Sequence, residues 1–239
     1  MYPHISYTKS KKDLEWRAED SFDVSKTEPI FSIADGVTLP KYEDTKSPTL
    51  ARQAADIFSV ATIEYVEEHP ESISTEKIYE AYNYAKNKIQ ERYEKLGVDL
   101  DSRRGVTGAV AIINGNSIVG SRFLDSGIAL FRKGKQIFKT PEFWSWRKKE
   151  GDRSYPYITL NEDMKTYIQT YDIPCEKGDF LALYTDGFED QFSLPEFVSI
   201  FANEDLKGVE EKLKNIDNVL SEKEGKRWGD ERTMVVVQI

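Results

Sequence analysis

Cysteine and histidine are scarce in this chain of 239 residues, which contains one cysteine, Cys175, and two histidines. A single cysteine excludes an internal disulfide and favours a reducing compartment. No apolar run approaches the ~20 residues that a membrane-spanning helix needs. The N-terminus also lacks the hydrophobic segment of a signal peptide. We therefore expect a cytoplasmic protein that has no membrane partner.

Positive charge is also scarce, because the chain has 33 lysines and arginines but 42 aspartates and glutamates, which gives a net charge of −9. This balance disfavours nucleic acid or an anionic membrane as the main partner. The aromatic and basic run Phe143–Lys149 could stack on bases, but in so acidic a chain we interpret it as a packing or substrate-contacting loop. We expect no nucleic-acid partner.

Repeats, low-complexity segments and linkers are absent from the sequence as well. A hydrophobic content of 39% with 12% aromatic residues is typical of a globular protein that buries a substantial core. We therefore predict a single domain over residues 1–239. Residues 139–165 are rich in aromatic, charged and turn-forming residues, and we expect a variable surface excursion there.

The first half of the chain predicts two amphipathic helices. One begins at Ser47, which serves as N-cap with Pro48 in the first turn. The other begins at Ser74 and stops at Gly97, a residue type that often ends helices. Both helices carry one apolar face, so they are expected to pack on a sheet.

The pattern then changes to that of strands. Residues Val106–Ile113 and Ser117–Phe123 flank an Asn114-Gly115 step, which is a strong hairpin signal. Segments 128–132 and 136–138 are expected to extend this hairpin into a meander.

Two further helices follow in the last third of the chain. The first is predicted to start at Ser193, with Glu196 completing a capping box, and the chain ends on a buried strand at 233–237. Helix pairs that alternate with hairpin-connected strands predict an α+β fold. We expect a four-layer α-β-β-α sandwich, with two mostly antiparallel sheets flanked by helix pairs.

Two apolar strands end in the same Asp-Gly step. One runs over Gly178–Gly187 and ends at Asp186, and the other covers 29–34 and leads into Asp35 and Gly36. Asp-Gly is also a common hairpin turn, but no second alternating strand follows either step. Carboxylates beside glycines, which permit close backbone approach, suit hard cations with oxygen ligands. The shared pattern predicts one common site.

Further acidic residues continue this pattern along the chain. The segments that contain them or accompany them are Glu19-Asp20-Ser21, Ile33-Ala34-Asp35-Gly36, Gly105-Val106-Thr107-Gly108-Ala109 with Leu124-Asp125-Ser126, Gly178-Asp179-Phe180 through Thr185-Asp186-Gly187, and Gly229-Asp230-Glu231-Arg232-Thr233. In these segments the chain resembles the metal-dependent protein phosphatases of type 2C, the PPM-type serine/threonine phosphatases. Each motif alone is weakly specific, but the five occur in the family's order over nearly the whole chain.

The resemblance implies a role for each matching residue. Asp35 resembles the carboxylate that bridges two metal ions, and the carbonyl of Gly36 helps to hold one of them. Asp186 and Asp230 resemble ligands of the first metal, and Glu19 matches the acidic residue that holds the second metal largely through water. The implied cofactors are two manganese or magnesium ions, which prefer oxygen ligands.

Other positions carry over with departures from the family pattern. Asp125 occupies the place of the aspartate that, with the residue at Asp186, can hold a third and weaker metal, although Leu124 stands where the family usually has glycine. Arg17 is the candidate for binding the substrate phosphate, although it lies closer to the acidic pair Glu19-Asp20 than the phosphate-binding arginine of the family usually does. Asp20 either contacts metal or caps a local turn. Val37 follows the Asp-Gly step where some members have a histidine, so water or another residue must protonate the leaving group.

The resemblance implies a phosphoprotein phosphatase that hydrolyses phosphoserine and phosphothreonine by attack of a metal-activated water. Asp35, Asp186 and Asp230 would form its catalytic core, and a phosphoprotein would be its partner. The alternatives are a catalytically silent phosphatase-like binding or regulatory module and a small-phosphoester hydrolase or two-metal nuclease. Clustered acids repel one another, so a silent module would have no chemical use for them.

Overall fold

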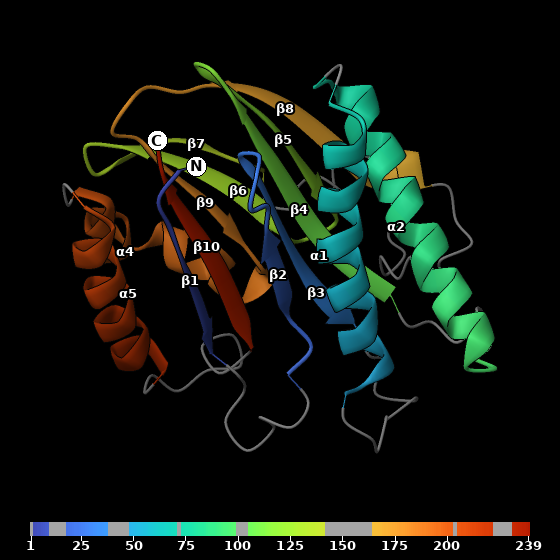
Figure 1. The fold of residues 1–239 in the computed structure, drawn as a ribbon. Coiled ribbons are helices and arrows are strands. Elements are labelled where there is room, and N and C mark those ends of the chain that lie inside the picture. Colours follow the sequence, from blue (N-terminus) through green and yellow to red (C-terminus); the bar gives the residue numbers. More distant parts are fainter. Residues whose placement is uncertain are drawn as a thin grey trace.

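The protein is a four-layer sandwich in which two β-sheets lie face to face and helices cover the outer face of each (Figure 1). The computed structural model describes residues 2–9, 18–37, 48–70, 73–98, 105–141, 164–202, 205–221 and 231–239. This arrangement confirms the predicted α-β-β-α fold. Of the helices in these ranges, none has the length and apolar character needed to cross a membrane.

The two sheets each have five strands, and every neighbouring pair is antiparallel. In spatial order, the first sheet contains β1 (His4–Lys9), β10 (Arg232–Gln238), β9 (Phe180–Tyr184), β6 (Gly127–Arg132) and β7 (Lys135–Lys139). The second contains β2 (Ser21–Val24), β3 (Ile30–Val37), β4 (Gly105–Asn114), β5 (Ser117–Phe123) and β8 (Ile168–Pro174). Each sheet therefore joins segments from distant parts of the sequence.

Helices α1 (Leu50–Glu68) and α2 (Thr75–Lys95) cover the second sheet (Figure 1). The N-cap of α2 is Ser74, whose side chain accepts the backbone N–H of Lys77, as predicted. The N-cap of α1 is Thr49, which accepts the N–H of Arg52, so the expected cap at Ser47 is wrong. Serine and threonine both serve as N-caps, so the sequence alone did not decide which of these residues precedes the first turn of the helix.

Three apolar layers hold these elements together. One lies between α1, α2 and the second sheet, one between the two sheets, and one between the first sheet and the C-terminal helices. Strand β4 illustrates the alternation of side chains: Ala109 and Ala111 face the other sheet, whereas Val110 and Ile112 face the helices. Because both faces are covered, this strand is apolar at nearly every position.

The β4–β5 hairpin forms as predicted, but its extension into a meander is wrong. Strand β6 pairs with β9 and β7 in the first sheet, whereas β5 belongs to the second sheet. The chain changes sheet at Leu124, where the backbone adopts a φ of 65°. Consecutive strands usually pair, and a left-handed residue between them is not visible in the sequence pattern.

The segment after β9 also differs from expectation. A 3-10 helix, Asp186–Ser193, leads into the short helix α4 (Pro195–Val198), and α5 (Leu206–Ser221) follows. The hydroxyl of Ser193 donates to the carbonyl of Asp190, and the N-cap of α4 is Leu194, which makes no side-chain cap. The predicted capping box of Ser193 with Glu196 is therefore wrong. Of the expected surface excursion, residues 142–163 lie outside the described part of the chain.

Candidate metal centre

One end of the sandwich gathers the acidic segments. Strands β2, β4 and β10 begin at this end, and β3, β5 and β9 finish there, as their antiparallel registers require. Cross-sheet contacts fix the two sheets to each other at this end. The hydroxyl of Thr185, after β9, donates to Oδ2 of Asp20, before β2, over 2.9 Å.

Asp35 stands at the centre of the acidic cluster. It lies within β3 opposite Thr107 of β4, and it is partly open to solvent. Desolvation, followed by the charges of Asp20, Asp186 and Asp125, raises the pKa of Asp35 well above its usual value. Carboxylates from four separate segments therefore lie near enough to oppose each other's ionisation.

Asp20 is the most deeply buried of these acids, with 3% of its surface exposed. Burial, followed by the charge of Glu231, raises its pKa to about 7, while hydrogen bonds from Thr233 and Thr185 act in the opposite direction. The side chain of Asp35 also lies within hydrogen-bond reach of the Asp20 carboxyl, and this contact contributes to the raised pKa of Asp35. Its side chain therefore joins the cluster rather than capping a turn.

Asp125 extends the cluster from the crossover between β5 and β6. Its Oδ1 is buried and meets no hydrogen-bond donor of the residues that the structure describes. Burial raises the pKa of Asp125, and a hydrogen bond from Thr107 opposes this shift. The preceding Leu124 has the left-handed backbone that favours glycine, which explains why glycine would suit this position.

The two glycines of the Asp-Gly steps are required by close packing of the backbone. A Cβ at Gly36 would lie 2.4 Å from the carbonyl oxygen of Ala51, at the start of α1. A Cβ at Gly187 would lie 2.2 Å from the carbonyl oxygen of Glu231. Any side chain would push these segments apart, so Gly36 keeps β3 close to the first turn of α1, and Gly187 keeps the segment after β9 close to the residue that leads into β10.

The predicted site residues fall into three groups. Asp20, Asp35, Asp125 and Asp186 interact electrostatically at one end of the sandwich. The backbone of Glu19 joins them there, because its carbonyl oxygen accepts the N–H of Gly36 over 3.2 Å. Asp230 and Arg17 lie outside the described residues, so their expected roles remain predictions.

The chemistry of these donors fits a hard divalent cation. The cluster offers carboxylate oxygens, one of them buried and without a donor, and cations such as magnesium or manganese prefer oxygen ligands. Within the described ranges, no three histidine, cysteine, aspartate or glutamate side chains are already gathered closely enough to hold a metal ion. Asp230, another predicted ligand, lies outside the described residues.

Sequence reasoning assigned no role to several residues that support this cluster. Thr185 and Thr107 donate to the aspartates, and Arg52 donates to the backbone carbonyl of Asp20 over 2.6 Å. Both threonines lie inside the quoted motifs, next to or opposite an acidic residue, which was a usable signal. Arg52 follows the acidic pair by 32 residues, and no spacing rule connects them.

The raised pKa values predict how pH affects the metal-free protein. The folded chain binds protons at Asp20 and Asp35 more tightly than the unfolded chain, whose aspartates titrate near 3.9. The free energy of unfolding should therefore fall as pH rises from about 4 to about 7, by on the order of a few kcal/mol. Urea denaturation in EDTA at pH 5.0 and pH 7.5 measures this change.

Two controls test the origin of this pH dependence. The Asp35→Asn variant should show a shallower slope, because it removes one of the two groups. Saturating manganese should reverse the slope, since metal ions bind the deprotonated carboxylates. A metal-free parent chain that is more stable at pH 7.5 than at pH 5.0 would contradict the prediction.

This combination of a four-layer sandwich and an acidic cluster at one end defines a class: the fold is that of the PPM-type serine/threonine phosphatases. The serine/threonine phosphatase PstP of Mycobacterium tuberculosis matches with a TM-score of 0.68 and 18% identity, over 99% of this chain and 98% of that one. The serine/threonine phosphatase of S. agalactiae matches with a TM-score of 0.68 and 17% identity, over 100% of both chains. A PstP catalytic domain described in complex with two manganese ions matches at 0.67 and 18%, over 99% of this chain and 97% of that one. No family model and no curated protein matches the sequence.

Proposed function

We propose that this protein is a metal-dependent phosphoprotein phosphatase that hydrolyses phosphoserine and phosphothreonine by attack of a metal-activated water. The observation that carries the proposal is the convergence of Asp20, Asp35, Asp125 and Asp186 at one end of the sandwich, from four separate segments. Mutual repulsion of these acids costs stability in the absence of a cation. The shared fold with phosphatases described with manganese or magnesium supports the same conclusion.

Each residue of the cluster has a defined part in this proposal. Asp35 and Asp186, together with Asp230, would hold the metal pair, with Glu19 near the second ion and Asp125 available to a third. When bound, two divalent ions supply an acidified water and neutralise charge on the phosphoryl oxygens. Thr185 fixes the orientation of Asp20, and the exposed position of Asp186 leaves the cluster open to substrate.

The positions of cysteine and histidine argue against a covalent mechanism. The N–H of Cys175 donates to the carbonyl of Asn116, at the β4–β5 turn, which is the opposite end of the sheet from the cluster. Burial raises the pKa of its thiol, which disfavours the reactive thiolate. His4 pairs with Val237 at the end of β10 far from the cluster, and His69 caps the far end of α1. A metal-activated water needs neither residue.

A phosphatase assay with and without metal tests the proposal. The chain should hydrolyse an aryl phosphate and a phosphothreonine peptide in manganese, and EDTA should reduce both rates about 100-fold or more, because the ions supply several kcal/mol of transition-state stabilisation. Initial rates across a manganese titration provide the measurement. The metal series must begin from protein that has been dialysed against EDTA.

The outcomes separate the alternatives. A chain that binds manganese but turns over neither substrate would be a phosphatase-like binding module. Turnover of the aryl phosphate with none of the phosphopeptide would indicate a small-phosphoester hydrolase. The net charge of −9 disfavours a nuclease, since a phosphodiester backbone would be repelled.

A further inference from the structure

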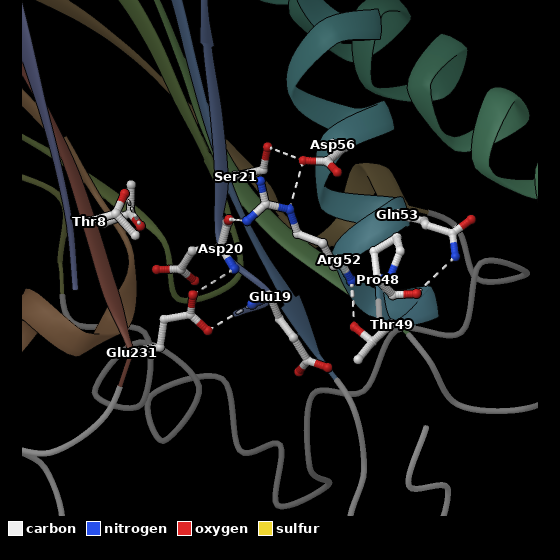
Figure 2. Close-up of polar contacts among 11 residues, drawn as sticks. Thr8, Glu19, Asp20, Ser21, Pro48, Thr49, Arg52, Gln53, Asp56 and Glu231 are labelled. Atoms are coloured by element: carbon white, nitrogen blue, oxygen red, sulfur yellow. Dashed lines mark hydrogen bonds and ion pairs between the residues drawn. The ribbon is translucent and has the colours of Figure 1, made fainter. Parts of the chain in front are cut away.

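The backbone of Glu19 and Asp20 is held from two sides by charged side chains (Figure 2). The carboxylate of Glu231 accepts the N–H of Glu19 at Oε2 over 2.8 Å and the N–H of Asp20 at Oε1 over 3.2 Å. From the other side, Nη1 of Arg52 donates to the carbonyl of Asp20 over 2.6 Å. One carboxylate therefore uses both oxygens to fix two consecutive peptide groups.

This contact links the two sheets. Glu231 directly precedes β10 of the first sheet, whereas Glu19 and Asp20 lead into β2 of the second, more than 200 positions earlier in the chain. Glu231 itself is held in place by its neighbours: the guanidinium of Arg232 pairs with Asp217 of α5. The N–H of Thr233 donates to the hydroxyl of Thr185 over 2.9 Å. The carboxylate of Glu231 therefore extends from a well-anchored start of β10 to the segment before β2.

The held segment is connected to the centre of the cluster. The carbonyl of Glu19 accepts the N–H of Gly36, next to Asp35, and the side chain of Asp20 contacts Thr185. A shift of this backbone would therefore displace the acidic side chains of Glu19 and Asp20 and the peptide beside Asp35 together. Displacements of this kind strongly weaken sites that depend on exact geometry.

We propose that Glu231 is a positioning residue whose carboxylate sets the backbone of Glu19 and Asp20 and thereby directs the side chain of Asp20 toward Asp35. The inference rests on the proposed function for what the site binds, but the contact stands on its own geometry. Arg52 completes the arrangement by holding the carbonyl of Asp20 while its Nε donates to Asp56 of the same helix. Glu231 acts through the backbone and is not proposed to touch metal or substrate.

Two substitutions separate positioning from charge. Glu231→Gln keeps the length of the side chain, but an amide has one acceptor oxygen, so one of the two N–H groups loses its partner. Glu231→Asp keeps the charge and shortens the side chain by one methylene, so both contacts are strained. A positioning role predicts that both variants are impaired, whereas a purely electrostatic role predicts impairment only in Glu231→Gln.

Glu67→Gln is the matched control. Its Oε1 accepts the hydroxyls of both Ser25 and Thr27 and ties a helix to the opposite end of β2, so an amide oxygen can still accept both. The chemical change is the same, but the site lies at the other end of the strand. This variant should bind manganese as the parent does.

The experiment combines amide hydrogen exchange by NMR on the metal-free chain with calorimetric titration of manganese alone. Glu231→Asp should exchange the amide protons of both Glu19 and Asp20 about tenfold faster, and Glu231→Gln should do so for at least one of them. Both variants should bind manganese about tenfold more weakly, as expected for the loss of one hydrogen bond to a charged group. Parent affinity for manganese in Glu231→Asp, or unchanged exchange at both amides in either variant, would overturn the inference. A parent chain that binds manganese without phosphatase turnover would refute the proposed function and leave this result intact.

Discussion

Asp35→Asn is expected to lower manganese-dependent turnover about 1,000-fold or more while leaving the protein folded. Asp35 lies where the charges of three other aspartates meet, so under the proposed function it would help to hold the metal ions. Loss of several kcal/mol of transition-state stabilisation corresponds to a tenfold rate decrease for each ~1.4 kcal/mol. The value of kcat/KM for an aryl phosphate at saturating manganese measures the effect.

The same variant should be more stable than the parent in EDTA near neutral pH. Asparagine can still donate to Asp20, but it removes a desolvated carboxyl that its neighbours oppose. Urea denaturation therefore provides the control: low activity with raised metal-free stability excludes misfolding as the cause. Turnover within tenfold of the parent would remove Asp35 from the mechanism.

Asp217→Ala should have the opposite effect on stability and lower the free energy of unfolding by about 3–5 kcal/mol. Asp217 and Arg232 form an ion pair that is almost fully buried, with 0% and 1% of their side chains exposed. Asp217 also accepts the hydroxyl of Tyr7 and pairs with Lys9, so one carboxylate joins α5, β1 and β10. Removing it leaves the charge of Arg232 buried without this partner. Urea denaturation at pH 7 measures the loss.

Lys214→Ala is the matched control on the same helix. It breaks the pair between Lys214 and Glu210, which are four residues apart and more exposed. Such pairs contribute about 0.3–0.5 kcal/mol. Equal destabilisation by the two substitutions would show that the buried ion pair has no special role in the fold.

The two predictions concern carboxylates that have opposite effects on the stability of the metal-free protein. At the outer face of the first sheet, a carboxylate is matched by cations and stabilises the fold. At the end of the sandwich, several carboxylates converge and raise one another's pKa values. A bound cation would offset that repulsion at neutral pH. The clustered carboxylates therefore lower the stability of the metal-free protein and support the proposed activity.

The sequence predicted the elements better than their connections. The apolar spacing of α1 and α2, the cap at Ser74 and the hairpin turn at Asn114 depend on neighbouring residues, and the structure confirms them. The meander was wrong because pairing of β6 with β9, rather than with β5, depends on residues about 50 positions away. The capping box at Ser193 was wrong because a 3-10 helix already uses that hydroxyl.

For the candidate site, local patterns identified Asp35 and Asp186, and the resemblance to the phosphatase family added Asp20 and Asp125. The Asp-Gly steps and their apolar strands are local patterns, and four predicted acids, Asp20, Asp35, Asp125 and Asp186, lie in one cluster. The supporting contacts of Glu231 and Arg52 could not be predicted in this way. Each joins segments that are remote in sequence, and their partners are backbone groups that every residue carries.

The sequence by itself therefore predicted most of the strands, though not β8, and the carboxylates at the ends of two of them, because these follow from short-range periodicity and composition. The tertiary structure decided which sheet each strand joins and that acids from four segments face one another. It did so because strands remote in sequence pair within each sheet and the two sheets pack face to face, which brings those strand ends together. That arrangement alone brings Asp35 next to Asp186, some 150 residues further along the chain.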